Sequence, residues 1–140
     1  MIVFLRSLEP VMFQKNTIIF NEFEDVSNVL FVCKGQIDIG YDINRIVKYK
    51  MRLNGHFQIG GFEICYRRRS QVIYKSSNFK KVSGYFIRKK AWNSLSDHCP
   101  EIYEMIKSSC LHFYDHNIRK VINKVKTLDI AKMNNRHDYR

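Results

Sequence analysis

A short stretch in the middle of the chain carries residue types that can bind a phosphate. Gly60 and Gly61 stand immediately before residues 62–66, a segment with room for one helical turn. Glycines add no Cβ, so a ligand can approach their backbone closely, and the first N–H groups of a helix face an anion. Arg69 then brings a permanent positive charge with bidentate geometry, and Ser70 adds a hydroxyl donor. The sequence therefore predicts an anion site formed by these two glycines, the arginine and the serine.

Other residue types that often carry chemistry form weaker patterns. His112 and His116 have the i, i+4 spacing of a metal-binding pair, but they do not follow the His-Glu-x-x-His pattern, so a solvated helix face is the better interpretation. Cys99 and Cys110 have no histidine and aspartate arranged to activate a nucleophile. We also find no paired carboxylates set for acid–base catalysis and no P-loop. We therefore expect no enzyme activity, no metal site and no cofactor.

The first three-fifths of the chain has the pattern of short β-strands separated by turns. Residues 29–33 form a nearly continuous apolar run, which predicts a strand buried on both faces. Residues 36–41 and 45–53 alternate with a period of two, as half-buried strands do. Seven or eight short strands at this spacing predict an antiparallel β-roll or jelly-roll barrel over about residues 10–88. The fold class is mainly β with C-terminal helices.

After Arg88 the apolar residues change to helical spacing. Residues 91–95 suit a short helix that ends before Pro100. A longer helix should follow, because apolar side chains recur three or four residues apart at Ile102, Ile106, Cys110, Phe113, Val121, Val125 and Leu128. We expect this stripe to face the β-roll or a second copy of the chain. Asn117 interrupts the stripe and predicts a bend or break.

The net charge of +11 is unevenly placed along the chain. Residues 1–42 hold three basic and six acidic side chains, whereas residues 43–140 hold 21 basic and seven acidic ones. The positive charges are spread through strands and a helix rather than gathered in one arm. This distribution favours a solvated face near an anionic membrane surface or an acidic partner over nucleic-acid binding. We expect no nucleic-acid partner.

The spacing of the cysteines and the hydropathy of the chain indicate the cellular compartment in which we expect the protein. The four cysteines are widely separated and form no Cys-x-x-Cys pair: Cys33, Cys65, Cys99 and Cys110. There is no secretory signal, and no apolar run approaches the roughly 20 residues that a membrane-spanning helix needs. We expect a soluble protein with reduced thiols in the cytoplasm.

The order of these patterns resembles the cyclic-nucleotide-binding domain family. Residues 30–37 are similar to the family's Leu-Tyr-Phe-Val-x-x-Gly-x-Val stretch, and residues 53–60 resemble the approach to its phosphate-binding cassette. Residues 69–72 resemble the Arg-Thr/Ala-x-Val that closes the cassette. The resemblance covers roughly residues 8–101. It implies a domain over residues 8–128, with the β-roll at about 10–88, helices at about 89–128, and flanking tails at 1–7 and 129–140.

The resemblance also implies a ligand, cAMP or cGMP, with its phosphate on Arg69 and on the N–H groups near Gly60 and Gly61. The sequence departs from the family at the glutamate that holds the ribose 2′-hydroxyl, because Gly61 stands in its place. Glu63 is the remaining candidate for ribose binding. Arg68 replaces the proline before the cassette arginine, and the cassette is about one residue shorter than in the family. We therefore expect weak nucleotide binding, or none.

A narrower resemblance concerns the protein to which the domain belongs. Residues 69–75, 84–89 and 135–139 resemble the cytosolic tails of ciliate-type potassium channels. This implies a regulatory domain at the inner face of a membrane, partnered by a channel pore domain or by identical subunits in a tetramer. Movement of its C-terminal helix would modulate gating. The alternative that stays open is a ligand-free structural or assembly module with a degenerate nucleotide pocket.

Overall fold

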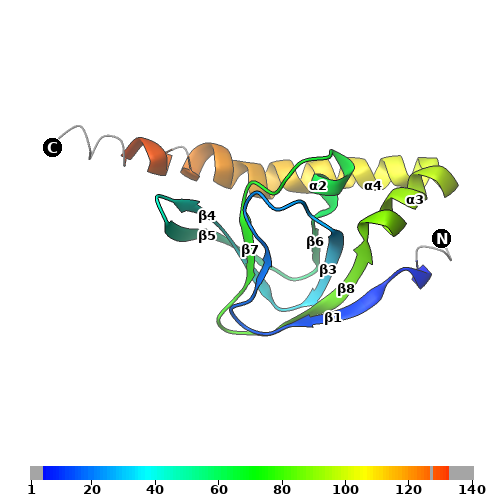
Figure 1. Ribbon diagram of the computed structural model, residues 1–140, viewed down its shortest axis with the longest axis horizontal. Helices are drawn as coiled ribbons and strands as arrows, with labels where there is room; N and C mark the ends of the chain where they lie inside the picture. Colours follow the sequence, from blue (N-terminus) through cyan, green and yellow to red (C-terminus); the bar gives the residue numbers. More distant parts are fainter. Residues whose placement is uncertain (1–4, 127, 133–140) are drawn as a thin grey trace.

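In the computed structural model, which describes residues 5–126 and 128–132, eight strands form two antiparallel sheets of four strands each. The first sheet has the order β1-β8-β3-β6 and the second β2-β7-β4-β5. The strands are β1 (Glu9–Phe13), β2 (Ile18–Phe20), β3 (Asn28–Lys34), β4 (Gln36–Ile43), β5 (Ile46–Asn54), β6 (Phe57–Ile59), β7 (Ile73–Ser76) and β8 (Val82–Arg88). Helices follow β8, which confirms the predicted β-roll with C-terminal helices (Figure 1).

The core lies between the two sheets and is filled mainly from the central strands. Its fully buried members include Val29, Leu30, Val32, Ile37, Ile39, Val72, Tyr74, Val82 and Ile87. The prediction that residues 29–33 are buried on both faces is correct only for part of the strand. Phe31 is half-buried against Trp92, with ring centroids 6.3 Å apart, and Cys33 is exposed. A helix covers the outer face of β3 at Phe31, and this cover does not reach the end of the strand.

Asn16 and Gly35 are two of the turn residues that have a positive φ. Asn16, in the predicted turn before β2, has φ of 57°. Gly35, between β3 and β4, has φ of 110°, and a Cβ there would lie 2.6 Å from the carbonyl oxygen of Lys81. A side chain at residue 35 would therefore both strain and crowd the backbone. These turns set the register of the strands that carry the core.

The helices lie on one side of the roll. They are α2 (Gly61–Cys65), α3 (Lys89–His98) and α4 (Pro100–Phe113), followed by the π-helical segments η1 (Tyr114–Ile118) and η2 (Val121–Lys126). We call α4, η1 and η2 together the C-terminal helix. It runs along the roll and passes over α2 (Figure 1). Among the described residues, no helix is long and apolar enough to cross a membrane.

The predicted break at Asn117 does not occur, because the chain continues there in π-helical turns. The Nδ2 of Asn117 donates to the carbonyl oxygen of Phe113 at 3.0 Å. The Asn117 side chain competes with backbone N–H groups for this carbonyl oxygen, and the wider π-helical turns accommodate it without ending the helix. The helix therefore continues across the roll without a break.

The apolar stripe of the C-terminal helix faces the roll from its middle onward. Cys110, Tyr114, Ile118 and Val121 are buried, and Ile106 and Phe113 are half-buried. Ile102 is 38% exposed and does not face the roll, so for this residue contact with a second copy of the chain stays a prediction. Leu128 is exposed as well, and the side chain of Val125 lies outside the described residues. The contact with the roll is therefore concentrated in the middle of this helix, where it passes α2.

The helical end is attached to the β4–β5 hairpin by a buried hydrogen bond. The hydroxyl of Tyr41 donates to Asp129 Oδ2 at 2.6 Å, and the ammonium of Lys50 lies 3.3 Å from the same oxygen. The hydrogen bond from Tyr41 is the main cause that lowers the pKa of the Asp129 carboxyl. Residues 128–132, which are helical, are thereby held against the second sheet.

We expect Asp129→Asn to lower the melting temperature at pH 7 because it removes the negative charge that Tyr41 and Lys50 contact. Folding lowers the pKa of the Asp129 carboxyl, so the carboxylate stabilises the folded chain at any pH above the ordinary aspartate pKa of about 3.9. This stabilisation disappears as the pH falls through the lowered pKa of the folded state. Thermal unfolding followed by circular dichroism at pH 7 and at about pH 2.5 checks this. Asp42→Asn, at an exposed position, is the control. Equal losses from the two variants at pH 7 would contradict the contact.

Candidate functional site

The first predicted site residues, Gly60 and Gly61, begin helix α2 as expected. Gly60 has φ of 91°, and a Cβ at this position would lie 2.6 Å from the carbonyl oxygen of Asn28. Only glycine combines this conformation with this approach to β3. The carbonyl oxygen of Gly60 accepts the N–H of Ile64 at 3.1 Å, which closes the single turn of α2. The backbone of the predicted cassette is thus in place between β6 and β7.

The donor groups of this cassette are used within the protein. The N–H of Gly61, which would face an anion, donates to Gln58 Oε1 at 3.2 Å. Ser70 is fully buried, and its hydroxyl donates to the carbonyl oxygen of Val72 at 2.6 Å. The N–H of Ser70 donates to the carbonyl oxygen of Glu24 at 3.0 Å. The structure therefore does not aim Gly61 and Ser70 at a common ligand position.

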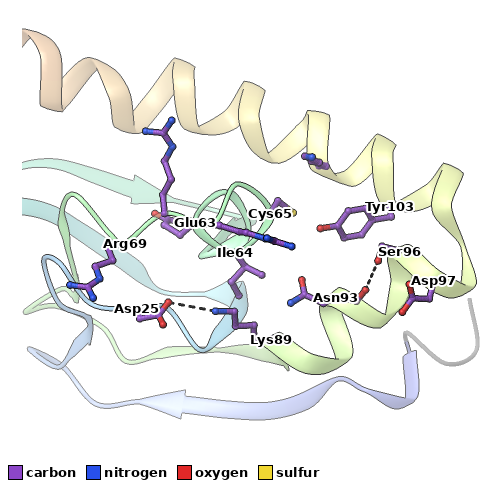
Figure 2. A pocket seen from close by; sticks show the side chains of 13 residues that line it. Asp25, Glu63, Ile64, Cys65, Arg69, Lys89, Asn93, Ser96, Asp97 and Tyr103 are labelled. Atoms are coloured by element: carbon purple, nitrogen blue, oxygen red, sulfur yellow. Dashed lines mark hydrogen bonds and ion pairs between the residues drawn. The ribbon is translucent and has the colours of Figure 1, made fainter.

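The arginine of the predicted site lies at a large open cavity instead. Arg69 is exposed and lines a cavity of about 870 Å³ between the loop after α2, helix α3 and helix α4. Figure 2 places Arg69 at one end of this cavity and Tyr103 and Asp97 toward the other. Further cations line this cavity: Arg67, Arg68, Lys89 and Lys107. The ammonium of Lys89 forms an ion pair with the carboxylate of Asp25 at 3.5 Å. This cavity can attract an anion through its surplus of basic side chains.

Glu63, the candidate for ribose binding, points into the protein. It is 2% exposed, and the hydroxyl of Tyr74 donates to its Oε1 at 2.9 Å. Its Oε2 has no hydrogen-bond partner within the described part of the chain. Burial in this poorly solvated position raises the pKa of the carboxyl. A ribose role for Glu63 stays a prediction, since no structural contact here tests it.

The C-terminal helix packs against both α2 and the roll. The ring of Tyr114 stacks on Phe62 with centroids 3.8 Å apart and an angle of 15°. The cavity enclosed beside this pair has a volume of only about 10 Å³ and is lined by Ile59, Glu63, Tyr74, Tyr114 and Ile118, among others. Small-molecule sites usually measure roughly 300–1,000 Å³. In this conformation the space between cassette, roll and C-terminal helix is filled by side chains.

The same packing accounts for the glycine at position 61. A Cβ there would lie 2.6 Å from Cys110 Sγ and 2.6 Å from Gln58 Oε1. A larger side chain at this position, such as the glutamate that the resemblance leads one to expect, would require the side chains of Cys110 and Gln58 to shift. The glycine at position 61 therefore allows the close approach of Cys110 of α4 to α2.

Sequence reasoning missed three residues that shape this site, Tyr74, Tyr114 and Cys65. A signal existed for Tyr114, because Cys110, Tyr114 and Ile118 recur every four residues and all are buried. No periodicity could reveal Tyr74, since three of the four residues of β7 are buried. The environment of Cys65 depends on α3 and α4, which are distant in the sequence.

Comparison with known proteins identifies the fold. No protein-family model matches this sequence, and no curated protein sequence does. Among solved structures, the regulatory domain of Toxoplasma gondii PKA with cAMP is similar with a TM-score of 0.57 and 11% identity, covering 63% of this chain and 33% of that one. A cAMP-binding acyltransferase from Mycobacterium smegmatis has a TM-score of 0.57 and 10% identity, covering 72% and 31%.

A cGMP-bound EAL enzyme has a TM-score of 0.53 and 16% identity, covering 59% of this chain and 22% of its own. The chain thus has the β-roll fold of cyclic-nucleotide-binding domains. It spans about a third or less of each of these solved chains.

The buried carboxyl of Glu63 makes a specific prediction for stability. Because its folded-state pKa is raised, stability should be greatest below the ordinary glutamate pKa of about 4.3 and should fall as the pH rises toward the raised value. Glu63→Gln keeps the acceptor for Tyr74 and removes the charge. It should raise the free energy of unfolding at pH 7 by about 1–3 kcal/mol and abolish that pH dependence.

Urea unfolding of both proteins between about pH 4 and pH 8 checks this prediction. The control is Glu104→Gln, at an exposed position of α4. A Glu63→Gln protein that is less stable than the parent at pH 7 would contradict the prediction, because it would show that the buried Glu63 carboxylate stabilises the folded chain.

Proposed function

We propose that this chain is a regulatory module of the cyclic-nucleotide-binding type that works without a bound nucleotide, because its own C-terminal helix occupies the cassette. The observation that carries the proposal is the stacking of Tyr114 on Phe62, which leaves a cavity of about 10 Å³. A nucleotide in that place would have to displace a helix whose buried residues belong to the same core as the β-roll.

The polar groups of the cassette support the same proposal. Gln58 holds the N–H of Gly61, and Val72 accepts the hydroxyl of Ser70. A cyclic phosphate would have to replace both hydrogen bonds, and the gain would be small because each is already satisfied. In a ligand-free module these contacts instead stabilise the loop between α2 and β7. Such a module would act through its surface, by docking or by assembly with other subunits.

We propose that the chain is a domain of a potassium or cation channel and lies at the cytoplasmic face of a membrane. This part of the proposal depends on the sequence resemblance alone, and its residues 135–139 lie outside the described part of the chain. Channel pore domains or identical subunits would be the partners, and the basic side chains around Arg69 would face anionic lipid. A tetramer of the chain in sedimentation analysis would support the subunit arrangement, and a monomer at all concentrations would speak against it.

Calorimetric titration with cAMP and with cGMP tests the ligand-free function. We expect no heat of binding at nucleotide concentrations up to about 1 mM, which corresponds to a binding free energy weaker than about −4 kcal/mol. Micromolar affinity that is lost in Arg69→Ala would refute the proposal, because it would place a working phosphate site at this arginine.

A second candidate function is nucleotide sensing through displacement of the C-terminal helix. It is favoured by the exposure of Arg69 at the 870 Å³ cavity, close in sequence to two more arginines. In this case cAMP or cGMP would bind weakly, and Arg69→Ala would abolish binding. Arg67→Ala would weaken it modestly, and this effect would decrease with added salt. The titration described above separates the two candidates.

A further inference from the structure

Cys65, at the end of α2, lies among hydrogen-bond donors. The indole Nε1–H of Trp92 donates to Cys65 Sγ at 3.2 Å. Tyr103 of α4 makes a further side-chain hydrogen bond to this sulfur, and Lys107 contributes a nearby positive charge. Figure 2 shows the Tyr103 hydroxyl directed toward Cys65. Donors and a cation around a sulfur stabilise its thiolate form.

The second thiol of this cluster belongs to Cys110 of α4. Cys110 is buried, and its Sγ lies against Gly61, 2.6 Å from the position of an added Cβ. Its side chain hydrogen-bonds to that of Cys65, and this contact is the first cause that lowers the pKa of Cys65, to about 6. The same contact and burial raise the pKa of the Cys110 thiol. These contacts favour the thiolate form on Cys65 and the protonated thiol on Cys110.

Small molecules can reach one member of the pair. Cys65 is half-buried and lines the 870 Å³ cavity, whereas Cys110 faces the interior. The cavity therefore gives small oxidants a path to this sulfur. The other cysteines differ, because Cys33 is exposed at the end of β3 and Cys99 precedes α4, and neither lines this cavity.

We propose that Cys65 and Cys110 form a peroxide-sensitive dithiol, in which Cys65 is oxidised first and Cys110 then closes a disulfide between α2 and α4. In the first step the Cys65 thiolate attacks hydrogen peroxide: the O–O bond breaks, an S–O bond forms, and the leaving hydroxide takes a proton to become water. In the second step the Cys110 sulfur displaces the sulfenic hydroxyl, which leaves as a second water with the thiol proton. Two thiols lose two electrons in total, and the peroxide gains them.

The disulfide would fasten the C-terminal helix to the cassette. Cys110 lies one helical turn before Tyr114, whose ring stacks on Phe62. Oxidation would thus fix the contact that covers the cassette, and reduction by a dithiol would release it. This inference concerns the cysteine pair itself and holds whether or not the module binds a nucleotide.

Peptide mapping of the oxidised full-length chain tests the proposal. The chain is treated with one equivalent of hydrogen peroxide, free thiols are alkylated, and trypsin is added. Each cysteine lies on its own tryptic peptide: residues 16–34, 53–67, 91–107 and 108–119. We expect peptides 53–67 and 108–119 joined, with the mass of two hydrogens lost, and the two others alkylated. Joined peptides that contain Cys33 or Cys99, or no joined peptide at all, would overturn the proposal.

Conservative variants keep the test independent of folding defects. Cys33→Ser/Cys99→Ser is the matched control and should give the same joined peptides as the parent. In Cys110→Ser, peroxide should leave a sulfenic acid on Cys65 that dimedone captures. Alkylation of Cys65 in the folded parent should have its pH midpoint near 6, and in urea near the ordinary thiol value of about 8.5. Tyr103→Phe should raise the folded midpoint, and a midpoint equal to that in urea would overturn the assignment.

Discussion

Ile118→Asp is expected to lower the free energy of unfolding by about 3–5 kcal/mol, because it places an unpaired carboxylate in the core. Ile118 is 1% exposed and lies in η1, at the small cavity lined by Tyr74 and Tyr114. No cation lines this cavity among the described residues. The substituted carboxylate would therefore either be buried without a partner or force the C-terminal helix away from the roll.

Urea unfolding measures this effect, and two variants of the same helix are its controls. Ile106→Asp, at a half-buried position, should give an intermediate loss, and Ile102→Asp, at a position 38% exposed, a loss below about 1 kcal/mol. The graded order matters more than any single value. Equal, small losses at Ile118, Ile106 and Ile102 would mean that the helix does not pack on the roll in solution.

Gly61→Ala is expected to destabilise the chain by about 1–3 kcal/mol, because the new Cβ would overlap Cys110 Sγ and Gln58 Oε1. A double-mutant cycle with Cys110→Ala identifies the source of this loss. Removing the sulfur gives the Cβ room, so the Gly61 substitution should cost less in the Cys110→Ala background. We expect a coupling free energy of about 0.5–2 kcal/mol, measured by urea unfolding.

Gly55→Ala is the matched control for this cycle. No atom lies within 4 Å of a Cβ at position 55, but its φ of 85° is unfavourable for alanine. Its loss should therefore be the same with and without Cys110→Ala. If Gly61→Ala shows the same additivity as this control, the close contact between α2 and α4 is absent in solution.

The strands and turns could be predicted because they depend on local patterns. Alternation over 36–41 and 45–53 gave β4 and β5, and Asn16 marked a turn with positive φ. The glycine pair at 60–61 located the start of α2 within one residue. These features need only neighbouring residues, so the sequence contains them.

The use of the donor groups could not be predicted from the sequence. Whether the N–H of Gly61 faces a ligand or Gln58 depends on how β6 enters α2, and whether Ser70 faces a ligand or Val72 depends on the loop that follows. The position of α4 decides how much room remains beside Phe62. Both donor contacts are local in the sequence, but they depend on loop geometry that no motif encodes. The position of α4 depends on packing between segments that are distant in the sequence.

The protection of the C-terminal helix is the most direct test that this helix, and not a nucleotide, covers the cassette. Amide hydrogen exchange of residues 106–118 should be measured without nucleotide and with about 1 mM cAMP or cGMP. We predict slow exchange that is the same in all three samples, because the helix is already docked on α2 and the roll. Rapid exchange in the free chain, or a change in the exchange of these amides when nucleotide is added, would contradict the central claim.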